Sequence, residues 1–216
     1  MFVLIIDYGS GNIKSVYNSV KKTLQNLNKP FELKVSSNLI EIVKADKIIL
    51  PGVGSFDKCM NRIREIKGLV ETLNDQIIIK RKPFLGICVG MQILADYGYE
   101  NQKTKGLSWI DGHVKSLKNS LCELQSQKIP HMGWNNLSIN KKNNLFHSIT
   151  DEDQFYFVHS YFFDIKHKKN IICTTKYGID IPAVVNEDNI YGFQFHPEKS
   201  GRSGLKILYN WLKLSK

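Results

Sequence analysis

The sequence contains only four cysteines and six prolines among 216 residues, and it has no long hydrophobic run. No apolar segment approaches the roughly 18 residues that a membrane-spanning helix requires, so we expect no membrane protein. Residues 1–12 (MFVLIIDYGSGN) carry no basic segment ahead of the apolar one, which argues against a secretory signal. The cysteines, at positions 59, 88, 122 and 173, form no CxxC pair and show no metal-ligand spacing. We therefore expect a cytoplasmic protein with reduced thiols, no metal site and no disulfide bond.

The charge is unbalanced, with 30 basic and 20 acidic residues, a formal net charge of +10 and a pI near 9.3. Such a balance is found in many proteins that bind nucleic acid. The distribution argues against that function, because lysine pairs such as Lys21-Lys22 and Lys141-Lys142 are scattered along the chain without alternating arginine and aromatic residues. We interpret the charge as a solvated, lysine-rich surface. An anionic substrate or an acidic partner is the alternative.

The order of the apolar segments predicts an α/β fold. Strand-like apolar runs lie at residues 2–8, 31–36, 45–50 (ended by Pro51) and 83–88. Helical periodicity lies between and after them, at 13–24, in the first half of 60–79 and at 91–98. Shorter strands are expected at 109–117, 155–165, 170–177, 181–186 and 190–197, before a helix at 205–214. The pattern indicates a single domain over residues 1–216, with a doubly wound, mostly parallel sheet and an antiparallel C-terminal part.

Three glycine-rich turns follow predicted strands, namely GSGN at 9–12, PGVG at 51–54 and GICVG at 86–90. The working groups of a parallel sheet gather at the carboxyl ends of its strands, so we expect the three turns at one edge. GSGN opens a helix, as a phosphate-binding loop does, but it lacks the third glycine of GxGxxG and the lysine of a Walker loop. We therefore expect no nucleotide at this turn.

Cys88 lies where a predicted strand turns directly into a predicted helix. Such a corner strains the backbone of its central residue and exposes the side chain, and Gly86 and Gly90 let neighbouring backbone pass close. A thiol at a helix N-terminus is favoured as the thiolate, which is the nucleophile. A small cysteine buried in an apolar strand is an equally good interpretation of this motif alone. Burial in the core is the interpretation we adopt for the cysteines at 59, 122 and 173.

The segment 191–201 (YGFQFHPEKSG) supplies a base and a carboxylate. Residues two apart on an extended strand point the same way, so His196 and Glu198 should share a face. A carboxylate beside an imidazole selects its tautomer and supports the imidazolium. By itself this pair is more typical of a surface ion pair. Together with Cys88, the two residues complete a set of nucleophile, base and orienting group.

The turn at 51–54 contains two glycines around one valine, so its backbone N–H groups can face an anion. A thiolate that attacks a carbonyl creates an oxyanion, which needs such donors. We predict Gly52 and Val53 as donors from this turn, and Val89, directly after the nucleophile, as a further donor. An ordinary strand-to-helix turn is the alternative for PGVG.

Six motifs together resemble one family. They are IDYGSGN at 6–12, PGVGSF at 51–56, KPFLGICVGMQ at 82–92, PHMGWN at 130–135, YFVHSY at 156–161 and GFQFHPEKSG at 192–201. These motifs are similar to those of the class I, or triad-type, glutamine amidotransferases, and in particular to the glutaminase subunits of imidazole glycerol phosphate synthase. The resemblance implies that the Cys88 thiolate attacks the carboxamide of glutamine. His196 then protonates the departing ammonia, Glu198 orients His196, and water hydrolyses the γ-glutamyl thioester to glutamate.

The resemblance also implies a partner and a substrate pocket, with no cofactor. The ammonia passes through a (β/α)₈-barrel cyclase subunit of a heterodimer, which makes imidazole glycerol phosphate and the aminoimidazole carboxamide nucleotide in histidine biosynthesis. By position, the glutamine-binding residues are Gly52, Gly54, Gln92, Glu100, Ser160 and Tyr161. The residues that face the barrel are Asn12, Trp134, Tyr156 and Lys199. Core packing of the two aromatic residues and a solvated lysine are the alternatives for this last group.

Three other functions are the alternatives to this interpretation. Trp109, Asp111 and the GFQF segment at 192–195 also fit paralogous glutaminases that supply ammonia to a barrel-like synthase of surface-sugar amidines. An intracellular cysteine peptidase or hydrolase usually carries a histidine directly after its cysteine, where this chain has Val89. A binding module with an inactive site would lack one of the three catalytic residue types, and none is missing. Because no residue follows Lys216, we expect the ammonia acceptor on another chain and little activity without it.

Overall fold

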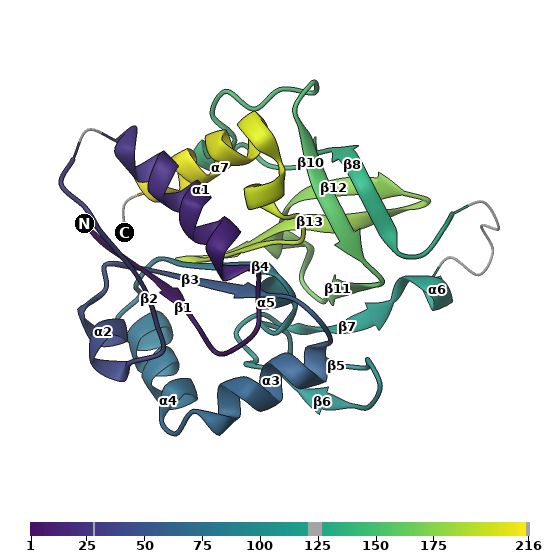
Figure 1. Ribbon diagram of the computed structural model, residues 1–216. Coiled ribbons are helices and arrows are strands. Elements are labelled where there is room, and N and C mark those ends of the chain that lie inside the picture. The colour runs from purple at the N-terminus through teal and green to yellow at the C-terminus, as the bar shows by residue number, and fades with distance from the viewer. Residues whose placement is uncertain (28, 121–126, 215–216) are drawn as a thin grey trace.

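The computed structural model describes residues 1–27, 29–120 and 127–214, and its centre is an eight-stranded sheet (Figure 1). The strand order is β2-β1-β3-β4-β14-β13-β12-β9. The bounds are β1 (Phe2–Ile6), β2 (Glu32–Ser36), β3 (Lys47–Gly52), β4 (Phe84–Cys88), β9 (Ser138–Ile139), β12 (Ile171–Tyr177), β13 (Ile179–Glu187) and β14 (Ile190–Phe193). β2, β1, β3, β4 and β14 are parallel, whereas β13, β12 and β9 pair antiparallel. The predicted mostly parallel sheet with an antiparallel C-terminal part is confirmed.

Helices cover both faces of this sheet (Figure 1). On one face lie α1 (Ile13–Gln25) and α7 (Gly201–Lys213), and on the other α2 (Leu39–Lys44), α3 (Phe56–Glu65) and α4 (Leu69–Asn74). α1 buries Val16, Val20 and Leu24, which follow one another at the four-residue spacing of a single helical face. Within the described ranges, no helix is both long enough and apolar enough to cross a bilayer.

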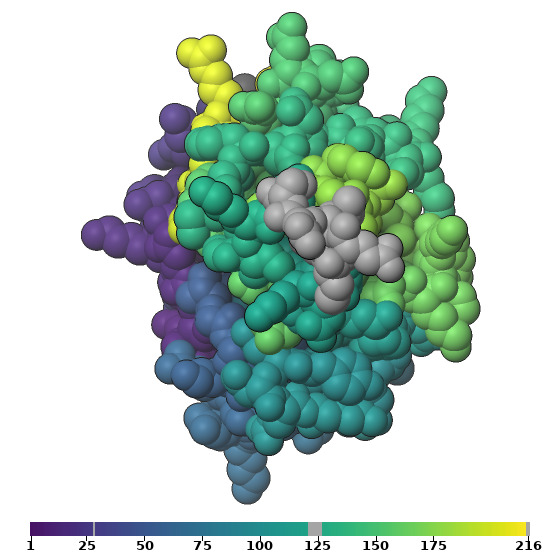
Figure 2. Space-filling view, turned by 90° about the vertical axis from the view of Figure 1, so that its right-hand side faces the viewer, coloured from purple at the N-terminus to yellow at the C-terminus, as the bar shows by residue number. Residues whose placement is uncertain are grey.

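Two smaller sheets flank the central one. The first pairs β8 (His131–Asn136) with β10 (Gln154–His159), and the second has the order β11 (Tyr161–Ile165), β7 (Gly112–Ser116), β5 (Tyr97–Gly98) and β6 (Thr104–Lys105). The run predicted as one strand at 155–165 is therefore divided at Ser160 between two sheets. Short helical segments complete the fold at α5 (Val89–Gln92), α6 (Leu117–Ser120), η2 (Asn144–Phe146), η3 (Lys168–Asn170) and η4 (Pro197–Lys199). Figure 2 shows the face on which residues of the second half predominate, with N-terminal residues along one side.

The core is formed by the apolar strands and the inner faces of the helices. Leu4, Ile49 and Phe84, from three neighbouring strands, are completely buried. Cys59 and Cys173 are buried in the same core, which confirms their predicted packing role. The cysteine at position 122 lies outside the described residues. In the part of the chain that the structure describes, no three side chains of the metal-binding types gather at one point.

The helix predicted at 91–98 is wrong in length, because α5 ends at Gln92. The segment 106–110 turns back beneath it and uses the carbonyls that a longer helix would need. The N–H of Leu107 donates to the Ile93 carbonyl at 2.8 Å, and the N–H of Trp109 donates to the Leu94 carbonyl at 2.9 Å. The backbone is thereby released from the helix, and residues 97–98 enter β5.

Two other boundaries also differ from the prediction. Pro51 does not end its strand, since β3 continues to Gly52 and pairs with β4 there. A proline is tolerated because β1 pairs with β3 only at Lys47–Ile49, so Pro51 has a neighbouring strand on one side only. The second half of 60–79 is helical as well, as α4 followed by a π-helical turn at Asp75–Ile79. Leu69, Leu73 and Ile77 are buried there at four-residue spacing, a helical period that the three consecutive isoleucines at 77–79 obscure.

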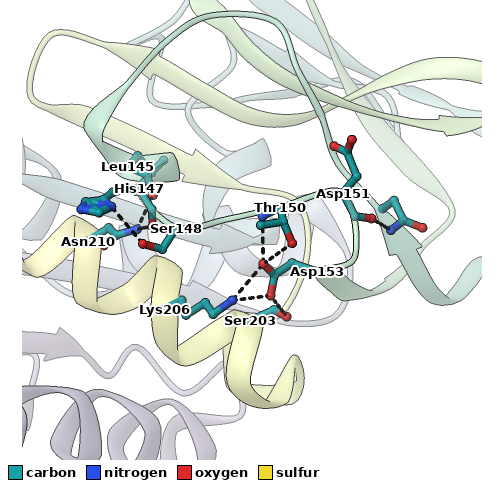
Figure 3. A network of polar contacts seen from close by, with 10 residues as sticks. Leu145, His147, Ser148, Thr150, Asp151, Asp153, Ser203, Lys206 and Asn210 are labelled. Atoms are coloured by element: carbon teal, nitrogen blue, oxygen red, sulfur yellow. Dashed lines mark hydrogen bonds and ion pairs between the residues drawn. The ribbon is translucent and has the colours of Figure 1, made fainter.

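The C-terminal helix α7 is joined to the loop before β10 by polar contacts (Figure 3). The Asp153 carboxylate accepts hydrogen bonds from Lys206 Nζ at 3.0 and 3.1 Å and from Ser203 Oγ at 2.6 Å. Farther along the helix, Asn210 Nδ2 donates to the Leu145 carbonyl at 2.9 Å. These contacts tie α7 to the segment that precedes β10.

Candidate active site

The corner at Cys88 has the strained geometry that its sequence predicts. Cys88 ends β4 and is the N-cap residue of α5, with φ 54° and ψ −111°. This conformation is rare for a residue with a side chain. A Cβ on Gly90 would lie 1.9 Å from the Leu50 carbonyl oxygen, and one on Gly86 would lie 2.3 Å from the Gly90 carbonyl oxygen. The expected exposure of the thiol is wrong, because Cys88 is only 4% exposed and lies within a cavity.

Replacing Gly90 by alanine is expected to destabilise the fold by about 3 kcal/mol or more, because no side chain can yield where backbone is the obstacle. Gly54→Ala is the control, since its methyl group would meet no atom of the described residues within 4 Å and only its φ of 97° is unfavourable. We expect the control to cost roughly 1–2 kcal/mol. Chemical unfolding of both variants measures the difference. An unchanged unfolding midpoint for Gly90→Ala would contradict the close approach of α5 to β3.

His196 and Glu198 meet in a buried contact. His196 Nδ1 lies 2.8 Å from Glu198 Oε1, and the side chains are 3% and 1% exposed. The predicted route to this contact is wrong, because β14 ends at Phe193 and residues 197–199 form the 3₁₀ turn η4 rather than an extended strand. The turn brings the carboxylate back to the ring. Ser200 holds it closed by donating from Oγ to the His196 carbonyl at 2.7 Å.

The electrostatics of this group favour a protonated imidazole. Burial of the ring disfavours its charge, but the neighbouring Cys88 sulfur and the Glu198 carboxylate outweigh the burial and raise the pKa of His196 to about 10. Glu198 Oε2 is buried with no hydrogen-bond partner among the described residues. The hydrogen bond from His196 is therefore the interaction that stabilises the negative charge of the buried carboxylate. At neutral pH the ring carries a proton that it can deliver to a group bound above Cys88.

A cavity of about 390 Å³ opens over Cys88 and His196. Of the residues predicted to bind glutamine, five line it, namely Gly54, Gln92, Glu100, Ser160 and Tyr161. Val53 and Val89 line it as well, whereas Gly52 does not. Gly52 lies behind the loop against α5, where an added Cβ would come within 2.7 Å of the Gly90 nitrogen. Burial raises the pKa of Glu100, although its Oε2 accepts a hydrogen bond of 2.9 Å from the Phe56 N–H.

Three of the residues predicted to face a partner lie together at the surface. Trp134 on β8 is 54% exposed, and its ring meets that of Tyr156 on β10 edge to face at 5.8 Å. Lys199 Nζ lies 5.6 Å from the centre of the Tyr156 ring, and Lys199 also lines the cavity. Asn12 is the N-cap residue of α1, which packs against η4. Core packing of Trp134 is excluded by its exposure, and Met132, 60% exposed on the same face of β8, extends this apolar surface.

Comparisons with known proteins identify the family. Residues 4–214 match the family described as glutamine amidotransferase class-I. The chain is 46% identical over 214 residues to the imidazole glycerol phosphate synthase subunit HisH of Pelagibacter ubique (strain HTCC1062), covering 99% of this chain and 100% of that protein. It is 40% identical over 216 residues to the HisH subunit of Brucella suis biovar 1 (strain 1330), covering 99% of each. The chain belongs to the HisH family of class-I glutamine amidotransferases.

Solved structures share the fold of this HisH-family protein. A putative GMP synthase protein from Thermoplasma acidophilum superposes with a TM-score of 0.68 at 18% identity, covering 98% of this chain and 92% of that one. A glutamine amidotransferase from Thermotoga maritima gives a TM-score of 0.58 at 19% identity, covering 94% of this chain and 78% of that one. The predicted family and its fold are confirmed, and a cysteine peptidase, the alternative from another class, is wrong.

The sequence predicts no role for several buried polar residues near the cavity. His131, His159 and Gln194 are 2%, 6% and 0% exposed. The burial of His159 could have been predicted, because it lies on the same face of β10 as the apolar residues Phe155 and Phe157. A histidine buried among apolar residues needs polar partners. His131 pairs with His159 of β10 and Gln194 with Gln92 of α5, and these partners are far away in the sequence.

The GSGN turn of the HisH chain supports the neighbouring PGVG loop. Ser10 Oγ donates to the Val53 carbonyl at 2.6 Å and lies 3.4 Å from Cys59 Sγ. The Cys59 thiol also approaches the same carbonyl, at 3.5 Å. These contacts hold the inner side of the loop from which Val53 and Gly54 line the cavity.

The buried side chains of His131 and His159 are expected to make the fold less stable in acid. Burial lowers the pKa of His131 to about 4, and burial followed by the proximity of His131 lowers that of His159 to about 3. The unfolded chain therefore binds more protons below its histidine pKa of about 6.5, and stability falls as the pH drops from there toward 4. The change should be roughly 2–3 kcal/mol per ring between pH 7 and pH 4.5. His196 has the opposite sign, because its raised pKa stabilises the fold in acid and this contribution is lost as the pH rises toward 10.

Guanidinium unfolding at the two pH values, compared between the wild type and a His131→Gln, His159→Asn double variant, isolates this contribution. The variant should lose less stability in acid than the wild type. Equal losses in the two proteins would contradict burial of the histidines in neutral form.

Proposed function

We propose that this HisH-family enzyme releases ammonia from glutamine with Cys88 as the nucleophile, His196 as acid and base, and Glu198 as the group that orients His196. The contact of 2.8 Å between His196 and Glu198, buried beside a thiol at a strained corner, carries the proposal. As a glutaminase subunit of imidazole glycerol phosphate synthase, the enzyme acts in histidine biosynthesis. We further propose that residues 1–216 work as one glutaminase domain in the cytoplasm, where this biosynthesis would take place.

The first half of the reaction is acylation. The Cys88 thiolate adds to the carboxamide carbon, a carbon–sulfur bond forms, and the carbonyl electrons move onto oxygen. The N–H groups of Val53 and Val89 are the proposed donors to this oxyanion, because both residues line the cavity beside the thiol. His196 gives its proton to the amide nitrogen, the carbon–nitrogen bond breaks, and ammonia leaves.

The second half is deacylation. His196, now neutral, takes a proton from water, and the resulting hydroxide adds to the thioester carbon. The carbon–sulfur bond breaks, and the new carboxylic acid gives its proton to solvent and leaves as glutamate. Cys88 is again a thiolate and His196 an imidazolium. The Glu198 carboxylate beside the ring favours this charged state of His196. Glu198 keeps the ring in one tautomer through both halves.

The cavity supplies groups for the remainder of a glutamine molecule. Glu100 is the acidic residue of the lining, and its carboxylate suits the α-ammonium group of the substrate. Gln92 of α5 and the junction of Ser160 and Tyr161 between β10 and β11 contribute further hydrogen-bonding groups. Gly54 has a positive φ, and no atom in the described part of the chain lies within 4 Å of its side-chain position, which leaves room for the substrate backbone.

The ammonia acceptor is proposed to belong to a partner, a (β/α)₈-barrel cyclase subunit. The exposed apolar surface of Met132 and Trp134, with Tyr156 beside it, gives that partner a docking area next to the catalytic residues. Lys199 joins this surface to the cavity. A partner bound here would cover the cavity mouth and receive ammonia before it reaches solvent.

The test measures glutamate released by this protein with and without a histidine-pathway cyclase barrel and its ribulosyl nucleotide. We expect a low rate for the chain alone and a rise of at least about 10²-fold with both present, since one misplaced oxyanion donor costs roughly 10²–10³ in rate. Cys88→Ala provides the blank. Rapid turnover without the partner would contradict dependence on it. No stimulation, with Cys88 still alkylated by a glutamine-like electrophile, would move the acceptor to a surface-sugar synthase.

A further inference from the structure

Two histidines face each other beside the catalytic site without a part in the hydrolysis. His131 of β8 and His159 of β10 are paired in register across their strands. Both side chains are buried, and His131 Nδ1 lies 3.0 Å from His159 Nε2. His131 is also stacked between the rings of Phe157, at 4.7 Å, and Tyr177, at 4.0 Å. The pair is therefore held on its faces by aromatic rings and along its edges by hydrogen bonds.

The hydrogen-bond partners allow only one arrangement of protons. Asn135 Nδ2 carries hydrogens only, so His131 Nε2, at 3.3 Å, must accept from it. The proton of His131 is then on Nδ1 and is donated to His159 Nε2. The proton of His159 is consequently on Nδ1, which donates to the Tyr161 carbonyl at 2.9 Å. Both rings are neutral, and an added proton would place two donors against each other.

The chain of hydrogen bonds continues to the nucleophile. The Tyr161 carbonyl accepts a second hydrogen bond, of 2.9 Å, from Gln92 Nε2. Gln92 Nε2 also donates to Gln194 Oε1 at 3.0 Å, and Gln194 Nε2 lies 3.9 Å from Cys88 Sγ. Gln194 is completely buried, so the orientation of its amide depends on Gln92 and on this contact with the sulfur.

We propose that His131 and His159 are positioning residues of the glutamine pocket. The neutral pair holds the Tyr161 carbonyl in place, and this carbonyl orients the Gln92 amide that lines the pocket. The inference rests on the proposed glutaminase function. It predicts that the pair controls how well the pocket receives glutamine, while the intrinsic reactivity of the thiol depends on His196 and Glu198.

The experiment compares two alkylating reagents on Cys88 of the full chain. Iodoacetamide reports the reactivity of the thiol, and 6-diazo-5-oxo-L-norleucine, which has the backbone of glutamine, reports the pocket. His159→Leu should slow alkylation by the glutamine-like reagent about 10- to 100-fold and alkylation by iodoacetamide less than about 3-fold, because a buried hydrogen bond to the pocket is lost. His159→Asn keeps a donor near the position of Nδ1 and should recover most of the rate, whereas His159→Gln should not.

Asn135→Asp tests the relay without changing a ring. The carboxylate has no hydrogen to donate, so at a pH high enough to keep the His131 ring neutral its proton must lie on Nε2, and His131 can no longer donate to His159. We expect a 3- to 10-fold slower reaction with the glutamine-like reagent and unchanged reaction with iodoacetamide. Equal rates in wild type and variants, or equal slowing with both reagents, would overturn the positioning role. If glutamine fails to protect wild-type Cys88 from the glutamine-like reagent, the proposed glutaminase function is itself contradicted.

Discussion

Replacing Cys88 by serine is expected to lower glutamine hydrolysis by a factor of about 10⁴–10⁶, because no other thiol of the described residues lines the cavity and a hydroxyl is far weaker than a thiolate. Serine has the same shape, so it can occupy the strained corner at φ 54° without a new contact. The fold should survive. Glutamate release in the presence of partner and nucleotide measures the loss.

Cys173→Ala is the matched control for this change. Cys173 is also a buried cysteine, on β12, and it does not line the cavity. Its replacement should leave turnover within about 2-fold and cost roughly 1 kcal/mol of stability through the lost packing. Residual activity of Cys88→Ser above one tenth of wild type would refute its role as the nucleophile.

Replacing Glu198 by glutamine should lower kcat by about 10²–10⁴, because the amide can present hydrogens to His196 and select the wrong tautomer. The change also removes a negative charge that helps to raise the pKa of His196 to about 10. The pKa of His196 should therefore fall in the variant, and a pH profile of kcat/KM should show the shift. The contact is buried, so solvent cannot replace the carboxylate.

Glu187→Gln controls for the loss of one carboxylate elsewhere. Glu187 ends β13 and pairs with Lys169 at 3.7 Å, away from the cavity lining. Its turnover and pH profile should match those of the wild type. A loss of less than about 5-fold in Glu198→Gln would show that His196 is oriented by other groups.

Some sequence predictions hold in detail because their causes are local. A strand that runs directly into a helix needs a strained corner, and the two glycines around Cys88 are required by backbone contacts of 1.9 and 2.3 Å. The apolar runs of β1, β3 and β4 can be satisfied only by burial on both faces, which demands helices on each side. The resemblance to the family then predicts which residues of this fold bind and attack glutamine.

The wrong predictions have tertiary causes. The helix expected at 91–98 is cut short because the distant segment 106–110 takes its carbonyls. The contact of His196 with Glu198 was expected for the wrong reason, since a 3₁₀ turn and not strand alternation forms it. Gly52 was expected in the pocket and lies behind it, because the path of the loop depends on its contact with α5.

By itself, the sequence determined the four strands β1 to β4 of the parallel sheet, the strained thiol and the family, since each follows from the local pattern of residues. Only the tertiary structure decided which polar side chains surround the thiol. His131 meets His159 because β8 and β10 pair in one register, and Gln92 meets Gln194 across 102 positions of sequence. Hydrogen bonds of this kind depend on the relative placement of whole strands, which no short stretch of sequence encodes.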